Sequence, residues 1–134
     1  MTPLVYGWVA VGGAPGGVFR FMLSGLVGRF AGEAMPWGTL AVNVIGSFVI
    51  GWFAAATTSS GRVFATPEIR TFVMIGLCGG FTTFSSFSLQ TLALFDDGAP
   101  VRAIANIVAS VALCLISWLG TAVAHIAPGI GRTR

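Results

Sequence analysis

The sequence predicts an all-α integral membrane protein with four transmembrane helices, the third of which is broken in the middle of the membrane. Hydrophobic residues make up 55% of the 134 residues and charged residues only 8%, and the mean hydropathy is +0.90. Apolar stretches of roughly 20 residues or more, long enough to cross the hydrocarbon core, alternate with short polar breaks. Glycine is frequent, with 19 residues, as expected where membrane helices pack closely. This composition excludes a soluble domain with an ordinary charged surface.

The four spans are expected near residues 4–28, 37–57, 69–95 and 101–126, forming one transmembrane domain over residues 1–134. The breaks between them are the segments "GRFAGEAMPWG", "TTSSGRVFATPEIR" and "FDDGAPVR", which hold charges, prolines and an interfacial tryptophan. The first apolar segment has no basic region before it, so we expect it to stay in the membrane rather than to be cleaved as a signal peptide.

The orientation of the spans is only weakly encoded. An even number of spans places both termini and the second break on one side of the membrane. The arginines at or beyond the ends of the spans are Arg62, Arg70, Arg132 and Arg134 on that side, and Arg29 and Arg102 on the other. This bias depends largely on the C-terminal tail, so the positive-inside rule decides little. Two interpretations stay open: copies of both orientations that pair as an antiparallel dual-topology dimer, or a single orientation with the termini inside.

Polar residues share one face of the second span. Thr39, Asn43 and Ser47 follow one another at intervals of four residues, which places them on one side of a helix. A lone hydroxyl in a membrane helix often bonds to a carbonyl of its own helix, one turn earlier. An amide cannot satisfy all its donors and acceptors in that way, so Asn43 needs partners outside its helix.

The fourth span repeats this arrangement. Its polar residues recur at intervals of three and four, and they are Asn106, Ser110, Cys114, Ser117 and Thr121. One face of this helix is therefore expected to contact water or other polar groups.

The third span contains the segment "GGFTTFSSFS", residues 79–88. Gly79 and Gly80 lower helix propensity in the middle of the membrane, and Thr82 and Thr83 can bond to freed backbone groups, so we expect local unwinding there. Irregular backbone at this depth is tolerated where it is buried in protein or lines a cavity, and its free carbonyls can hold a small cation.

Phenylalanines recur at every third residue of the same segment, at Phe81, Phe84 and Phe87. Such a stripe is usually plain packing. Here it is interleaved with hydroxyls, and the edge of a benzene ring is the positive end of its quadrupole. Ring edges together with hydroxyls and an amide could therefore surround a small anion.

These segments resemble a known family. "GGFTTFSSFS", the segment "GTLAVNVIGSF" at 38–48 and Arg20 in "GGVFRF" are similar to the signature segments of the Fluc (CrcB) fluoride channels of microbial membranes. The resemblance covers essentially the whole chain. It implies a non-enzymatic channel that exports fluoride across the inner (plasma) membrane and so relieves fluoride toxicity. It also implies an antiparallel dual-topology homodimer with two pores and a central structural sodium ion.

The resemblance also implies roles for individual residues. Asn43 matches the pore asparagine, Phe84 and Phe87 match the phenylalanines whose ring edges face fluoride, and Gly79 and Thr82 match the residues whose carbonyls bind sodium.

The remaining matches are hydroxyls and a cation. Thr83 and Ser86 fall in the hydroxyl-bearing part of the motif, Ser110 matches a serine of the polar track on the fourth helix, and Arg20 matches an arginine near the vestibule.

Two positions depart from the family pattern. Cys114 stands where the family usually has a second hydroxyl, and Gln90 stands where an acidic residue is common. The polar track is therefore altered, or the chain works with a sister chain in a heterodimer.

Two other function classes are alternatives to a fluoride channel. A small dual-topology drug or cation exporter coupled to protons would need a titratable group in the membrane, and no Asp or Glu falls within the predicted spans. A non-conducting assembly subunit would account for the glycines but not for the polar faces. Flux of an ion through the purified protein distinguishes these classes.

Overall fold

The computed structural model describes residues 3–32, 34–57 and 63–126, and every regular element within these ranges is a helix. Three spans are single helices, α1 (Pro3–Ala31), α2 (Trp37–Ala56) and α6 (Pro100–Ile126). The other span is a series of shorter elements, α3 (Pro67–Arg70), the π-helix η1 (Thr71–Cys78), α4 (Gly79–Phe81) and α5 (Phe84–Asp96).

The described part of the chain holds 4 helical segments that are long and apolar enough to cross a membrane, at Pro3–Ala31, Trp37–Ala56, Pro67–Asp96 and Pro100–Thr121. The predicted all-helical fold with four spans is thereby confirmed. Part of the charge count used for orientation lies outside the described residues, namely Arg62, Arg132 and Arg134.

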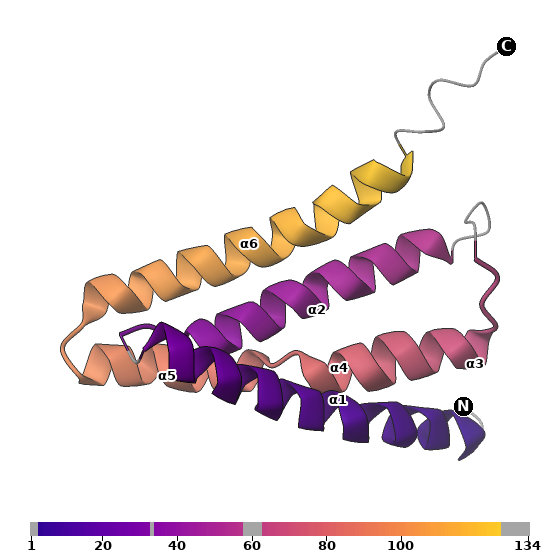
Figure 1. Cartoon of the computed structure of the whole chain (residues 1–134), viewed down its shortest axis with the longest axis horizontal. Coiled ribbons are helices and arrows are strands. Elements are labelled where there is room, and N and C mark those ends of the chain that lie inside the picture. Colours follow the sequence, from indigo (N-terminus) through magenta and orange to yellow (C-terminus); the bar gives the residue numbers. More distant parts are fainter. Residues whose placement is uncertain (1–2, 33, 58–62, 127–134) are drawn as a thin grey trace, which may run out of the picture.

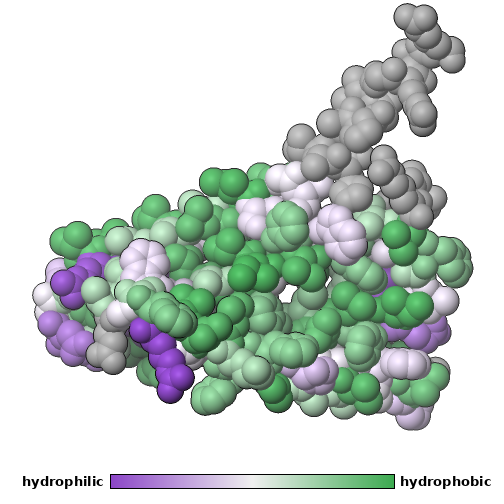
Figure 2. All heavy atoms as spheres, in the orientation of Figure 1, coloured by the Kyte–Doolittle hydropathy of each residue, from purple (hydrophilic) through white to green (hydrophobic). Residues whose placement is uncertain are grey.

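The spans run alternately in opposite directions, with α2 between α6 and the broken third span (Figure 1). α2 packs along α6, and α1 packs along η1 and α4. Hydrophobic side chains cover the middle of the face shown in Figure 2, and hydrophilic ones gather toward its ends. This distribution suits helices that lie across a membrane.

Glycines bring α1 and the third span into direct backbone contact. A Cβ atom on Gly12 would lie 3.0 Å from the Cα atom of Gly76, and one on Gly80 would lie 2.6 Å from the carbonyl oxygen of Gly13. Only residues without side chains allow this approach. The glycines therefore act as the small packing residues expected in a membrane bundle.

The third span breaks at Thr82 and Thr83 rather than at the glycines. Gly79 has helical backbone angles (φ −64°, ψ −36°), and Gly80 lies within α4. Thr82 (φ −77°, ψ 156°) and Thr83 (φ −150°, ψ 114°) are extended. The break itself was predicted, but its expected position at the glycines was wrong, because Gly80 keeps the helix closely packed against α1.

Arg70 ties the start of the third span to the end of α2. Its Nη1 donates to the carbonyl oxygen of Thr57 at 2.9 Å and also to Thr57 Oγ1. Thr57 is the C-cap of α2, and its hydroxyl donates to the carbonyl oxygen of Phe53 at 2.7 Å. A cation at this position satisfies C-terminal carbonyls and complements the helix dipole.

Candidate functional site

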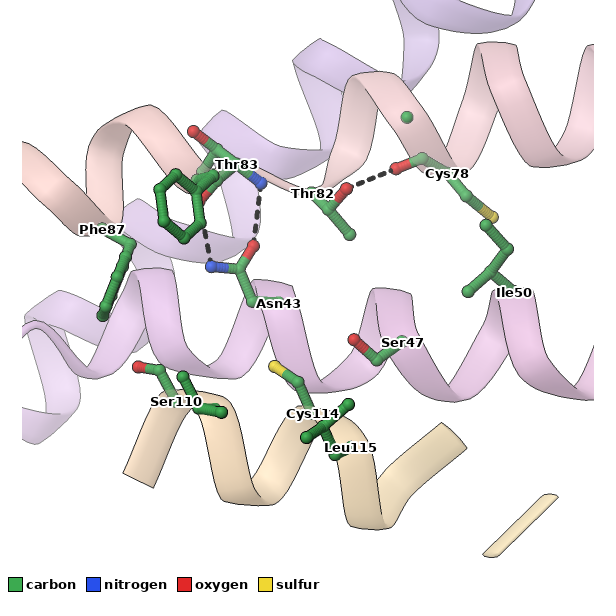
Figure 3. Close-up of a pocket in the computed structure, with 13 residues that line it drawn as sticks. Asn43, Ser47, Ile50, Cys78, Thr82, Thr83, Phe87, Ser110, Cys114 and Leu115 are labelled. Carbon is green, nitrogen blue, oxygen red and sulfur yellow. Dashed lines mark hydrogen bonds between the residues drawn. The ribbon is translucent and has the colours of Figure 1, made fainter. Parts of the chain in front are cut away.

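A cavity of about 400 Å³ lies beside the break, between α2, α5 and α6 (Figure 3). It brings together most of the residues that the sequence singled out, namely Asn43, Gly79, Thr82, Thr83, Phe84, Phe87 and Ser110. These residues come from three different spans, so only the tertiary fold could assemble them.

Asn43 on α2 is bonded to the backbone of the break. Its Nδ2 donates to the carbonyl oxygen of Thr83 at 3.0 Å, and the backbone N–H of Thr83 donates to its Oδ1 at 2.8 Å (Figure 3). The backbone N–H of Thr83, which the break removes from the helix, is thereby satisfied, and the carbonyl of this N-cap residue gains a side-chain donor. The second N–H of the carboxamide has no partner among the described residues, and Asn43 lines the cavity.

The hydroxyls of the break form hydrogen bonds with nearby backbone groups and with one another. Thr83 Oγ1 accepts from the N–H of Ser86 at 3.1 Å and so caps the start of α5. The same oxygen donates to Ser86 Oγ at 3.1 Å, and Ser85 Oγ lies 3.1 Å away. Thr82 Oγ1 donates to the carbonyl oxygen of Cys78 at 3.0 Å. These bonds hold the extended residues in one conformation.

Gly79 keeps a helical backbone but loses a helical partner. In a continuous helix, its carbonyl would accept from the N–H of Thr83, four residues later, and that N–H is turned toward Asn43. Gly79 is also exposed on the surface of the single chain. A carbonyl group without its helical donor therefore lies at the break.

The two phenylalanines occupy different environments. Phe87 is 9% exposed, whereas Phe84 is 77% exposed, and their ring centroids lie 5.3 Å apart with the planes inclined by 50°. Both rings line the cavity. Phe87 belongs to the interior of the chain, and Phe84 stands at its outer surface.

The α6 side of the cavity carries Ser110 and Cys114. The thiol of Cys114 and the hydroxyl of Ser47 on α2 extend toward the same space (Figure 3). Cys114, which belongs to the predicted polar face of α6, therefore forms part of the cavity wall. Cys78, which was not among the predicted site residues, lines the cavity as well.

A second cavity, of about 240 Å³, contains the two predicted residues that the first one lacks, Arg20 and Ser86. Thr83 lines both cavities. Ser24 also borders the second cavity and was missed by the sequence reasoning, although its position four residues after Arg20 places both on one face of α1.

Gln90 connects this second cavity with a third one, of about 350 Å³, which extends to Trp37 and Asp97 near the helix ends. Its Oε1 atom is buried and has no hydrogen-bond partner within the described part of the chain. Neighbouring cavities thus share polar lining residues, Thr83 between the first and the second and Gln90 between the second and the third.

Comparison with known proteins gives concordant matches. A family model described as "CrcB-like protein, Camphor Resistance (CrcB)" matches residues 7–121. The chain is 56% identical over 124 residues to the fluoride-specific ion channel FluC of Opitutus terrae, which covers 92% of this chain and 91% of that protein. It is 54% identical over 124 residues to the protein of the same name from Paramagnetospirillum magneticum, covering 92% of this chain and 97% of that one.

Proposed function

The chain belongs to the CrcB/FluC family of fluoride-specific ion channels, and from this premise we propose that fluoride leaves the cell passively along the cavities that meet at Thr83. The protein is a membrane channel and not an enzyme. The observation that carries the proposed route is the cavity beside the break, which is lined by an amide, hydroxyls and phenylalanine rings.

The chemistry of fluoride suits such a lining. The ion is small and strongly hydrated, so a pathway must replace its water by preorganised donors. The second N–H of Asn43 and the ring edges of Phe84 and Phe87 can supply positive ends of dipoles without a formal charge. The hydroxyls of Ser47 and Ser110 can add to them where they turn toward the ion. Neutral groups hold the ion weakly enough for release, which conduction requires.

Arg20 has a different role in this proposal. It borders the second cavity with Ser86 and Gln90, and neither Phe84 nor Phe87 lines that cavity. A cation there raises the local concentration of anions before they reach the first cavity.

An antiparallel dimer is proposed from the exposed face of the third span. Gly79, Phe84, Ser85 and Ser88 are exposed on the single chain, although they belong to the membrane-spanning segment. Hydroxyls and a carbonyl that lacks its helical donor are costly where they face lipid. A second copy in the opposite orientation would cover them, and a sister chain could take the same place.

The proposed structural sodium ion would lie between the two copies. The carbonyl oxygens of Gly79 and Thr82 in each copy would supply hard oxygen ligands of the kind that such a cation prefers. The described residues contain no group of three or more His, Cys, Asp or Glu side chains that could hold a metal, so backbone oxygens are the ligands at hand. The carbonyl of Gly79 supports this assignment, because its helical donor, the N–H of Thr83, is bonded to Asn43 instead.

The function is tested with liposomes that contain only this purified chain. We expect passive fluoride efflux, recorded with a fluoride electrode, without a proton gradient and with little chloride flux. Comparable fluxes of the two halides, or flux only with a second protein present, would overturn the proposal of a self-sufficient selective channel.

A further inference from the structure

A chain of hydrogen bonds connects α5 to α6 behind the first cavity. Thr91 Oγ1 donates to the carbonyl oxygen of Phe87 at 2.7 Å, Asn106 Nδ2 donates to Thr91 Oγ1 at 2.9 Å, and Ser110 Oγ donates to Asn106 Oδ1 at 3.4 Å. Asn106 is only 1% exposed, so neither water nor lipid replaces these partners. The two ends of this series of hydrogen bonds, Phe87 and Ser110, both line the first cavity.

The direction of the chain follows from the chemistry of its members. The carbonyl of Phe87 can only accept, so the single hydroxyl proton of Thr91 is used there. Thr91 can then only accept from Asn106, which turns the amide nitrogen toward α5 and the amide oxygen toward α6. The amide oxygen can only accept, so the single hydroxyl proton of Ser110 is turned toward Asn106.

Ser110 consequently presents oxygen lone pairs to the cavity. A fluoride ion beside it gains a donor only if the hydroxyl turns away from Asn106, and this leaves a buried amide oxygen without a partner. Asn106 and fluoride therefore compete for one proton.

We propose that Asn106 is a positioning residue that weakens fluoride binding at Ser110, and so favours release of the ion along the pathway. This inference deepens the proposed function and depends on Ser110 bordering the fluoride route. The long Ser110 bond of 3.4 Å suits a contact that the passing ion can exchange for its own.

Two substitutions test the proposal, because Asn106→Leu and Asn106→Ala both remove the acceptor but differ in volume. Each should lower the half-saturating fluoride concentration by about 5- to 10-fold and reduce the maximal flux, since one competing hydrogen bond is lost. If the leucine variant does not assemble, the alanine variant supplies the measurement. Ser117→Ala is the matched control, because that hydroxyl of α6 donates to the carbonyl of Val44 and takes no part in the hydrogen bonds that link Phe87, Thr91, Asn106 and Ser110.

The decisive comparison repeats both Asn106 substitutions in a Ser110→Ala background. There the shift in half-saturating concentration should disappear, because no hydroxyl proton is released. The same shift without the Ser110 hydroxyl, or no shift in either background, would overturn the proposal. Block by a thiol reagent at Cys114 in the same liposomes shows separately whether the cavity carries the ion, so a failure of the route is distinguishable from a failure of this inference.

Discussion

Asn43 and Thr83, on different spans, are joined by two hydrogen bonds of 3.0 and 2.8 Å that pair a side-chain amide with a backbone peptide. The pair stands at the wall shared by the first two cavities, because Thr83 lines both. One residue of α2 thus holds the broken helix open and faces the proposed ion route.

Asn43→Asp should abolish fluoride flux. The carboxylate keeps the size of the side chain but cannot donate to the Thr83 carbonyl, and its charge repels an anion by about 4 kcal/mol at 4 Å in a medium of effective dielectric constant 20. Thermal unfolding in detergent should also show a loss of about 1–3 kcal/mol, because the hydrogen bond to the Thr83 carbonyl is lost and the carboxylate faces the carbonyl oxygen. Flux equal to that of the native chain would show that Asn43 serves packing alone.

Gly80→Ala should destabilise the chain, whereas Gly79→Ala should leave the fold of the single chain intact. A Cβ atom on Gly80 would lie 2.6 Å from the carbonyl oxygen of Gly13, whereas the nearest such atom to a Cβ on Gly79 is the carbonyl oxygen of Met74 at 3.8 Å. Overpacking of this kind costs about 1–3 kcal/mol. Unfolding midpoints in detergent measure the difference, and equal midpoints for the two variants would contradict the packing role of Gly80.

Gly80→Leu extends the same comparison to assembly. The larger side chain should separate α1 from the third span, and dimer retention on size exclusion should fall more than in Ser110→Ala, which removes only one hydroxyl. A leucine variant that stays dimeric and conducts normally, with or without sodium, would show that this contact is dispensable.

A small methanethiosulfonate reagent should block flux through Cys114. The thiol lines the first cavity, and an added group would occupy the route. Cys114→Ser should resist the reagent although Cys78 remains, because Cys78 is only 3% exposed. Block that persists in the serine variant would assign the effect to Cys78 instead.

Arg70→Met should lower stability by about 1–2 kcal/mol without changing halide selectivity, because the guanidinium caps the C-terminus of α2 away from the cavities. Arg102→Met is a matched control, since it also removes one arginine, from an exposed position on α6. Equal unfolding midpoints for both variants would mean that the cap contributes nothing measurable.

Labels at the C-terminus should react from both sides of the cell membrane if the chain inserts in two orientations. An impermeant thiol reagent applied to intact and to opened cells measures this, with a cysteine added at the C-terminus of a Cys78→Ser, Cys114→Ser chain. Labelling from one side only, in cells without a related chain, would exclude the antiparallel homodimer.

Local properties of the sequence were enough to predict that the protein lies in a membrane, that it has four helical spans and that the third span is broken. Hydrophobicity over about 20 residues identifies a span without knowledge of its neighbours. The intervals between Asn43 and Ser47, and between Ser110 and Cys114, likewise predict that each pair shares one polar face of its helix, and in the structure all four residues line the first cavity.

The position of the break and the partners of the buried amides depended on the tertiary structure. Gly80 has low helix propensity, yet it stays helical because α1 packs against its backbone, and the chain unwinds at Thr83, where Asn43 supplies the missing hydrogen bonds. The direction of the Ser110 hydroxyl could not be predicted from the sequence either. It depends on the orientation of the Asn106 amide, which is set by hydrogen bonds to Thr91 and Phe87 on α5. Propensity acts within a few residues, whereas a buried polar group must be satisfied by whatever the fold brings beside it.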